Sequence, residues 1–344
     1  MARIGRLMAL SLAITAISAS RCLANDTMRT APAPEVFAPG VISGPANDGS
    51  PTFTPDGNTL YFARSGANWG FILESYEVNG QWSEPQVASF SGQFSDSQPA
   101  LSPDGKRLIF TSMRTLSTAG PNGTTVAPRM VIGNSGALWE VDRVGDHWSE
   151  PVRLPETVNL SPRVFKATIT GDGSLYFMAQ TDDAKTWRLY RSQYRDGSYQ
   201  KAEPLSFSDG NHTDVDPQIA ADESFLIFSS AGRAKPDDAH EHLYIVFKDG
   251  ISWGAITPLR YDGDYEKGPA DDGEANLGPD RRTLYFTSSR TVHIHATGRK
   301  KRQRKTSNAS ISGITPTATF GRSRLLPGWT SRRPADRTMA RTIA

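Results

Sequence analysis

Acidic side chains recur at one position of this chain and could act together on a ligand. Asp48, Asp96, Asp214 and Asp272 each stand seven residues before the position of a turn proline or its equivalent, and Glu274 follows the last of them. Carboxylates gathered in this way can hold a cation, or act as the acid and base that cleave a glycosidic bond. The alternative is that each aspartate binds backbone amides. Because structure repeats whereas catalysis requires asymmetry, the recurrence favours the structural role.

Two arginines, Arg114 and Arg129, lie in the longest interruption of the pattern, MRTLSTAGPNGTTVAPRMVIGNSG (113–136). A connection of this length between two strands is commonly either functional or disordered. On a mostly acidic body these cations could receive an anionic group. A surface loop without a ligand is the alternative that we favour.

Two further runs have residue types that bind metals. In KPDDAHEH (235–242), Asp237, His240 and His242 could face one ion, but their spacing is no specific zinc signature, so a solvated loop is favoured. The run DGDYEKGPADDGE (262–274) is rich in carboxylates but lacks the order of an EF-hand loop. We therefore predict no cofactor, with calcium as the ion that the second run would suit.

Motifs of common enzyme classes do not occur in the chain. There is no G-x-S-x-G elbow of a serine hydrolase, no phosphate-binding loop and no dinucleotide fingerprint. A catalytic assignment would therefore depend on analogy between folds, which is weak support for a function.

The elements that position these residues come from a phrase that returns five times. Each copy has an apolar strand, a tight turn of the Pro-Asp-Gly kind and a second strand; a third strand and an Asn-Gly or Asp-Gly turn before an aromatic residue usually follow. Such units must stack around an axis to bury their faces, so we predict an all-β propeller of four-stranded antiparallel blades. The copies are DGSPTFTPDGNTLYF (48–62), DSQPALSPDGKRLIF (96–110), VFKATITGDGSLYF (164–177), DVDPQIAADESFLIF (214–228) and DGEANLGPDRRTLYF (272–286).

The ends of the pattern predict how the ring closes. PEVFAPGVIS (34–43) resembles a fourth strand without the preceding three, so it should complete the last blade. Five blades fit the length of 34–290, and a six-bladed ring is the alternative. The predicted blades are near 48–92, 96–158, 164–207, 214–259 and 272–290.

The last segment, 291–344, departs from the repeat in composition. It holds 12 Lys or Arg and one acid, and it shows neither alternation nor an Asp-Gly turn. The interpretations are a disordered segment, a basic arm, or a shift of the reading frame that removed a third strand. We favour the frame shift and expect this tail to lie outside the propeller.

Net charge excludes one class of partner. The whole chain has a formal charge of +2, but without the tail and the three arginines before residue 25 it keeps 23 basic and 35 acidic residues, a charge of −12. A nucleic-acid partner requires a basic face, so we expect a protein, small-molecule or glycan partner instead.

The N-terminal segment 1–24 has the features of a secretory signal. Arg3 and Arg6 precede an apolar stretch that is too short for a permanent membrane anchor, and small residues follow. Cleavage after Ala24 would remove Cys22, the only cysteine; the alternative, a lipoprotein acylated at Cys22, conflicts with Arg21 before it. We expect a periplasmic or secreted protein.

The turn phrases TPDGNTLYFAR (54–64) and SPDGKRLIFTS (102–112) identify a resemblance. Together with Asp48 and Asp96 they resemble the WD40-like propeller repeats of TolB and related exported bacterial proteins, over about residues 34–290. The separate N-terminal α/β domain of TolB has no room before the first blade. The resemblance implies a periplasmic binding or scaffold module and no shared catalytic residues; oligogalacturonate lyases also resemble this repeat class and supply the alternative of a carbohydrate-active enzyme.

Overall fold

A computed structural model describes residues 34–66, 69–119, 122, 124–233, 238–260, 270–289 and 319–324. Within these residues the antiparallel strands form five sheets of four or five strands. One copy of the repeated phrase supplies the first two strands of each sheet. The all-β propeller predicted from the sequence is thereby confirmed. The described part of the chain contains no helix long and apolar enough to cross a membrane.

The first three blades follow the chain order. The first has β2 (Asn47–Phe53), β3 (Thr59–Gly66), β4 (Trp69–Val78), β5 (Gln81–Trp82) and β6 (Gln86–Val87). The second has β7 (Asp96–Leu101), β8 (Arg107–Ala119), β9 (Thr125–Val144), β10 (His147–Trp148) and β11 (Val152–Arg153). The third has β12 (Val164–Ile169), β13 (Leu175–Gln180), β14 (Trp187–Ser192) and β17 (Glu203–Pro204), with the small ladder β15 (Tyr194–Arg195) and β16 (Ser198–Tyr199) beside it.

The last two blades include both ends of the described chain. The fourth has β18 (Thr213–Ile219), β19 (Phe225–Ala231), β20 (His242–Asp249), β21 (Ser252–Trp253) and β22 (Thr257–Pro258). The fifth has β23 (Asp272–Leu277), β24 (Thr283–Ser288), β25 (Thr319–Arg324) and β1 (Glu35–Val36), in the order β23-β24-β25-β1.

The turn between the first two strands has the same chemistry in every blade. The turn aspartate accepts a hydrogen bond from the backbone amide two residues later, at 2.9–3.1 Å. In the first two blades, the following glycines Gly57 and Gly105 have φ of +78° and +73°, which suits a residue without Cβ. These local interactions explain why the repeated phrase forms hairpins.

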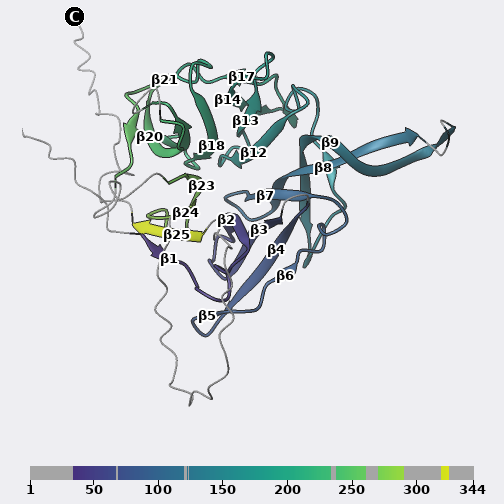
Figure 1. The fold of residues 1–344 in the computed structure, drawn as a ribbon, viewed down its shortest axis with the longest axis horizontal. Helices are drawn as coiled ribbons and strands as arrows, with labels where there is room; N and C mark the ends of the chain where they lie inside the picture. The colour runs from purple at the N-terminus through teal and green to yellow at the C-terminus, as the bar shows by residue number, and fades with distance from the viewer. Residues whose placement is uncertain are drawn as a thin grey trace, which may run out of the picture.

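The first strands of the five sheets stand around a common axis. β2, β7, β12, β18 and β23 contact one another in that order, and β23 contacts β2 to close the ring (Figure 1). Each of the five seams between neighbouring blades holds its own apolar cluster. Trp148 is buried in the seam between the first and second blades, while Trp82 and Trp253 pack against two other seams.

The N-terminal strand completes the last blade, as predicted, but it does so through a strand that was not foreseen. β25 comes from the segment 291–344, pairs with β24 from Thr283↔Arg324 to Ser288↔Thr319, and takes the place of the third strand. β1 then pairs with β25. The expectation that the whole tail lies outside the propeller is therefore corrected for residues 319–324, because backbone pairing does not require an alternating pattern.

The interruption 113–136 is a long hairpin and not an open loop. β8 and β9 continue their pairing beyond the blade, through Arg114↔Ile132 and Ser117↔Arg129, so the two strands project from the body (Figure 1). The predicted signal segment 1–24 and the greater part of the tail lie outside the described residues.

Candidate functional site

A β-bulge interrupts the first strand of every blade at the same place. The register with the second strand shifts there in all five sheets. The residue five positions before the turn proline or its equivalent has a positive φ although it is not glycine, a conformation that costs free energy and is frequent at functional sites. We call these residues the axial column: Ser50 (φ 50°), Gln98 (φ 53°), Lys166 (φ 45°), Asp216 (φ 52°) and Glu274 (φ 51°).

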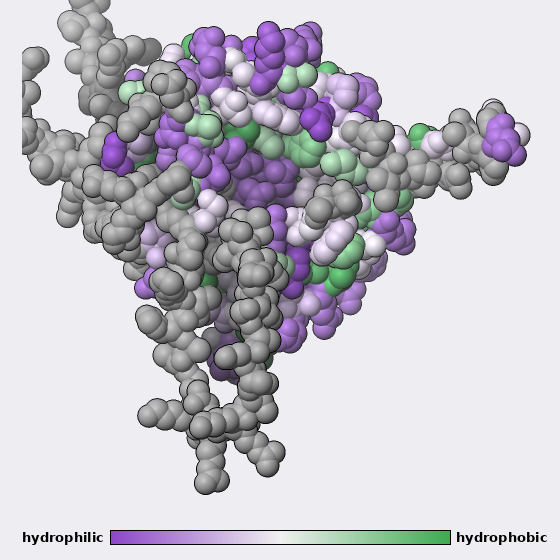
Figure 2. All heavy atoms as spheres, in the orientation of Figure 1, coloured by the Kyte–Doolittle hydropathy of each residue, from purple (hydrophilic) through white to green (hydrophobic). Residues whose placement is uncertain are grey.

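Side chains of the axial column join neighbouring blades. The backbone amide of Lys166 donates to Gln98 Oε1 at 3.0 Å, and the backbone amide of Glu274 donates to Asp216 Oδ2 at 3.0 Å. Thr287 Oγ1 donates to Glu274 Oε2 at 3.1 Å. Hydrophilic residues fill the middle of the ring in the space-filling view (Figure 2). The column is therefore polar, ordered by inter-blade hydrogen bonds and different in every blade.

Lys166 is the least expected member of the column because it is fully buried, with 0% of its surface exposed. Burial lowers the pKa of its ammonium group, while the charges of Glu274 and Asp216 oppose that shift. A lysine inside a protein is normally paired. Within the described residues, however, Nζ of Lys166 has no hydrogen-bond partner.

Two acids whose carboxyl oxygens lie close to Gly273 have raised pKa values. Burial, followed by the charge of Glu274, raises the pKa of Asp216 to about 6, although Lys166 opposes the shift. Burial, followed by the charge of Asp216, raises the pKa of Glu241 to about 8. Buried acids with raised pKa values that interact with one another are often found in functional sites.

The repeated aspartates have a different environment from the axial column. Three of them are at most 1% exposed, and each forms an ion pair with an arginine of its own blade. The carboxylates are thus neutralised separately and do not gather around the axis. The pairs are Asp48 with Arg64 at 2.6 Å, Asp96 with Arg114 at 2.7 Å and Asp214 with Arg233 at 2.6 Å.

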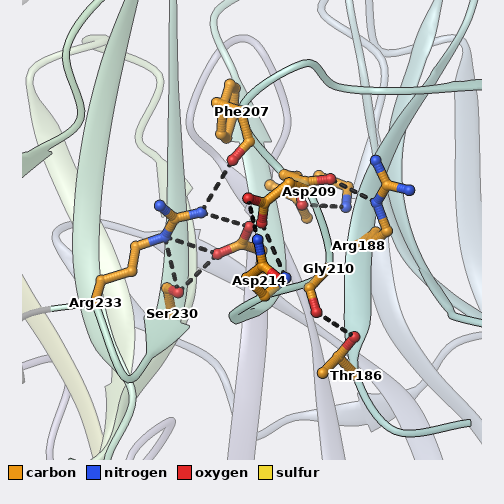
Figure 3. Close-up of polar contacts among 11 residues, drawn as sticks. Thr186, Arg188, Phe207, Asp209, Gly210, Asp214, Ser230 and Arg233 are labelled. Carbon is orange, nitrogen blue, oxygen red and sulfur yellow. Dashed lines mark hydrogen bonds and ion pairs between the residues drawn. The ribbon is translucent and has the colours of Figure 1, made fainter. Parts of the chain in front are cut away.

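Figure 3 shows this module in the fourth blade. Arg233 Nη2 donates to Asp214 Oδ2 and, at 3.3 Å, to the carbonyl of Phe207, which precedes the first strand. Ser230 Oγ donates to Asp214 Oδ1 at 2.7 Å. The aspartate and arginine therefore link the segment before the first strand of the blade to the end of the second strand.

The remaining predicted acids separate into two classes. Asp272 is fully buried at the start of β23, where its backbone amide donates to the carbonyl of Glu241 at 2.9 Å. Glu274 belongs to the axial column and is partly exposed. Of the acids proposed from the sequence, Glu274 is the one that the structure places among the charged groups of the axis.

Arg114 does not stand free in a loop. It is 6% exposed on β8, with its guanidinium 5.1 Å from the centre of the Phe110 ring and 5.4 Å from that of Trp139. Since its charge is paired with Asp96, it is not available to an anionic ligand. The backbone of Arg129 lies in β9 opposite Ser117.

The histidines of the run 235–242 each contact one carboxylate. His240 Nδ1 lies 3.2 Å from Asp271 Oδ1, and His242 Nε2 lies 2.9 Å from Asp238 Oδ2. Asp237 lies outside the described residues, as do residues 262–269 of the carboxylate-rich run. In the part of the chain that is described, no three His, Cys, Asp or Glu side chains are arranged to hold a metal ion.

Lys166 and Asp216 were not predicted from the sequence. The predicted acids stand seven residues before the turn proline, where the residue type repeats, whereas Lys166 and Asp216 stand two residues later. The signal was present in the sequence, because that later position contains Ser, Gln, Lys, Asp and Glu in the five copies. A column that is polar but never repeats is what an asymmetric site requires.

Comparison with known proteins found matches among solved structures alone. No protein-family model and no curated protein matches the chain. Among solved structures, it is similar to putative TolB from Agrobacterium tumefaciens, with 17% identity, a TM-score of 0.43, and 71% of each chain covered. TolB from Acinetobacter baumannii matches with 14% identity and a TM-score of 0.44, covering 81% of this chain and 54% of that one. A glycoside hydrolase matches with 12% identity and a TM-score of 0.45, covering 80% and 94%. These matches to TolB and other propeller proteins are distant.

Proposed function

We propose that this chain is an exported β-propeller that acts as a binding module and contacts its ligand through the axial column. The observation that carries the proposal is the contrast between the two positions of the first strand. The position that repeats is neutralised inside each blade by an arginine. The position that does not repeat places Ser50, Gln98, Lys166, Asp216 and Glu274 around the axis.

The axis is also a suitable place for a ligand in mechanical terms. The strained backbone at each bulge is held by blades that pack against each other through buried apolar clusters. Rigid elements position polar groups more accurately than loops do. The polar groups of the axial column are therefore held in fixed positions.

Features of the sequence support the proposed export and class of partner. The segment 1–24 supports secretion to the periplasm or the medium. The acidic body supports a protein, glycan or small-molecule partner and opposes a nucleic acid.

The test is to export the full chain with its own N-terminal segment and to apply the purified protein to an array of oligosaccharides and peptides. We expect to recover the protein in the periplasmic or secreted fraction. We also expect it to bind the array, with binding weakened by Lys166→Met and unchanged by Lys248→Met. Lys248 is a suitable control because it is 21% exposed and pairs with Glu223 at 2.5 Å, outside the axial column. A folded chain that remains in the cytoplasm and retains neither class of probe would contradict the proposal.

A second candidate function is a carbohydrate-active enzyme, either a glycoside hydrolase or an oligogalacturonate-type lyase. The observation that favours it is the pair of acids with different proton affinities, since burial raises the pKa of Glu241 to about 8 and that of Asp216 to about 6. A protonated carboxyl group beside an ionised one is the arrangement of an acid and base pair.

Incubation with aryl glycosides and with oligogalacturonate separates the two functions. Release of the aryl alcohol or of an unsaturated uronate, lost in Glu241→Gln and Asp216→Asn, would establish the enzyme. Binding without product formation would establish the binding module.

A further inference from the structure

Among the buried polar atoms that have no hydrogen-bond partner within the described residues are Ser50 Oγ and Lys166 Nζ of the axial column and Ser229 Oγ of β19. All three side chains are 0% exposed. An unsatisfied buried polar group costs free energy, so native proteins normally give such groups a partner. Ser50 and Lys166 belong to the axial column, and Ser229 Oγ lies 3.5 Å from the place of a Gly273 Cβ on β23, so a ligand at the axis could supply the missing partners.

Two glycines make room for the acids that face these atoms. Around the place where a Cβ of Gly273 would lie, Asp216 Oδ2 is at 3.0 Å, Glu241 Oε2 at 3.4 Å and Ser229 Oγ at 3.5 Å. Polar groups from the fourth blade thus converge beside β23. On the side of the fifth blade that faces the first, the carboxylate of Glu274 occupies the place that a Cβ of Gly49 would take.

The charges of this cluster select the chemistry of the ligand. The ammonium form of Lys166 can only donate hydrogen bonds, and an ionised carboxylate can only accept them. A cationic ligand would be repelled by Lys166, while an anionic ligand would be repelled by the acids around it. A hydroxyl group satisfies both sides because it donates to a carboxylate and accepts from an ammonium group.

We propose that Ser50, Lys166, Asp216, Ser229, Glu241 and Glu274 form a site for a neutral, hydroxyl-rich ligand, that is, a sugar or another small polyol. This inference rests on the proposed function and specifies the ligand class of its axial site. The ligand bridges blades that the polypeptide also joins by hydrogen bonds, such as the one from the Glu274 amide to Asp216.

A cavity of about 370 Å³ lies further along the same strands, at the end where the Pro-Asp-Gly turns meet. Its lining includes Thr52, Thr168, Gln218 and Asn276, which carry hydroxyl and amide groups. Thr52, Thr168 and Asn276 each stand two residues after a member of the axial column. This volume is within the range of small-molecule sites, so the cavity is the competing location that the experiment must separate.

The experiment is calorimetric titration of the full exported chain with galactose, arabinose and myo-inositol, and with methylammonium and acetate as charged probes. We expect a hydroxyl-rich probe to bind and both charged probes to fail. Lys166→Met and Asp216→Asn should each weaken that binding at least about tenfold, because each removes a charged hydrogen-bond partner. Lys248→Met should change nothing.

Should an axial variant fail to fold, Ser229→Ala removes one hydroxyl without adding volume and should still weaken binding. Tighter binding of methylammonium or acetate than of any polyol would overturn the inference. So would polyol binding that Asn276→Ala abolishes and the axial variants leave intact. If the peptide array retains the chain while no polyol binds, the ligand class is wrong and the proposed binding module stands.

Discussion

The ion pair between Asp96 and Arg114 gives a stability prediction with a defined magnitude. Arg114 Nη2 donates to the two carboxylate oxygens at 2.7 and 2.8 Å, and the two side chains are 0% and 5% exposed. Ser112 Oγ and Ser91 Oγ donate to the same carboxylate at 2.6 and 2.9 Å. Asp96→Ala leaves the guanidinium buried without its counter-charge, which should lower the free energy of unfolding by about 3–5 kcal/mol.

Urea unfolding followed by tryptophan fluorescence measures this change. Asp96→Asn should cost less than the alanine variant because its amide keeps some of the hydrogen bonds. Asp142→Ala is a control, since Asp142 pairs with Arg107 but is 54% exposed, and it should cost no more than about 1 kcal/mol. If both neutral variants of Asp96 unfold at higher urea than the parent, the carboxylates repel one another and the structural role is wrong.

Three further measurements test other parts of the account. Gly105→Val should lower stability by about 1–3 kcal/mol, because Gly105 has φ +73° and its Cβ would lie 3.0 Å from Pro55 Cδ; a loss below about half a kcal/mol would show that the turn tolerates a branched residue. The pKa of Glu241 is raised to about 8 from an ordinary 4.5, so the folded chain retains a proton that the unfolded chain releases, and stability should fall with rising pH in this window by up to about 1.4 kcal/mol per unit. Glu241→Gln should flatten that slope in melts recorded across the window, and an unchanged slope would assign it to another group. Phe37→Ala should cost about 3–5 kcal/mol and expose β1 to hydrogen exchange, because Phe37 is 6% exposed and its ring lies 5.0 Å from Tyr285; a loss under about 1 kcal/mol would show that β1 does not close the ring.

The features that could be predicted from the sequence depend on local chemistry. The turn at Pro55, Asp56 and Gly57 is determined by its own residues, so five copies of it predicted five hairpins and, through stacking, the propeller. The N-terminal strand could be assigned to the last blade because its phrase resembles the fourth strands of other blades.

The features that escaped prediction depend on the register between strands and on distant partners. In the first blade the axial residue is Ser50 and not Asp48, at a bulge between Gly49 and Thr52 that no turn signal marks. The arginine that neutralises each aspartate stands at a different distance along the chain, as Arg64 and Arg233 show. β25 has no alternating pattern, so its pairing with β24 depends on the edge that β24 offers.

A crystal structure of the chain soaked with the polyol that binds best would test the central claim most directly. The account predicts ligand density at the axis, with hydroxyl groups within hydrogen-bonding distance of Lys166 Nζ and of Asp216 or Glu274, and with the Asp96–Arg114 pair unchanged. Density confined to the cavity beside Thr52 and Asn276, or bound to a repeated aspartate released from its arginine, would contradict it.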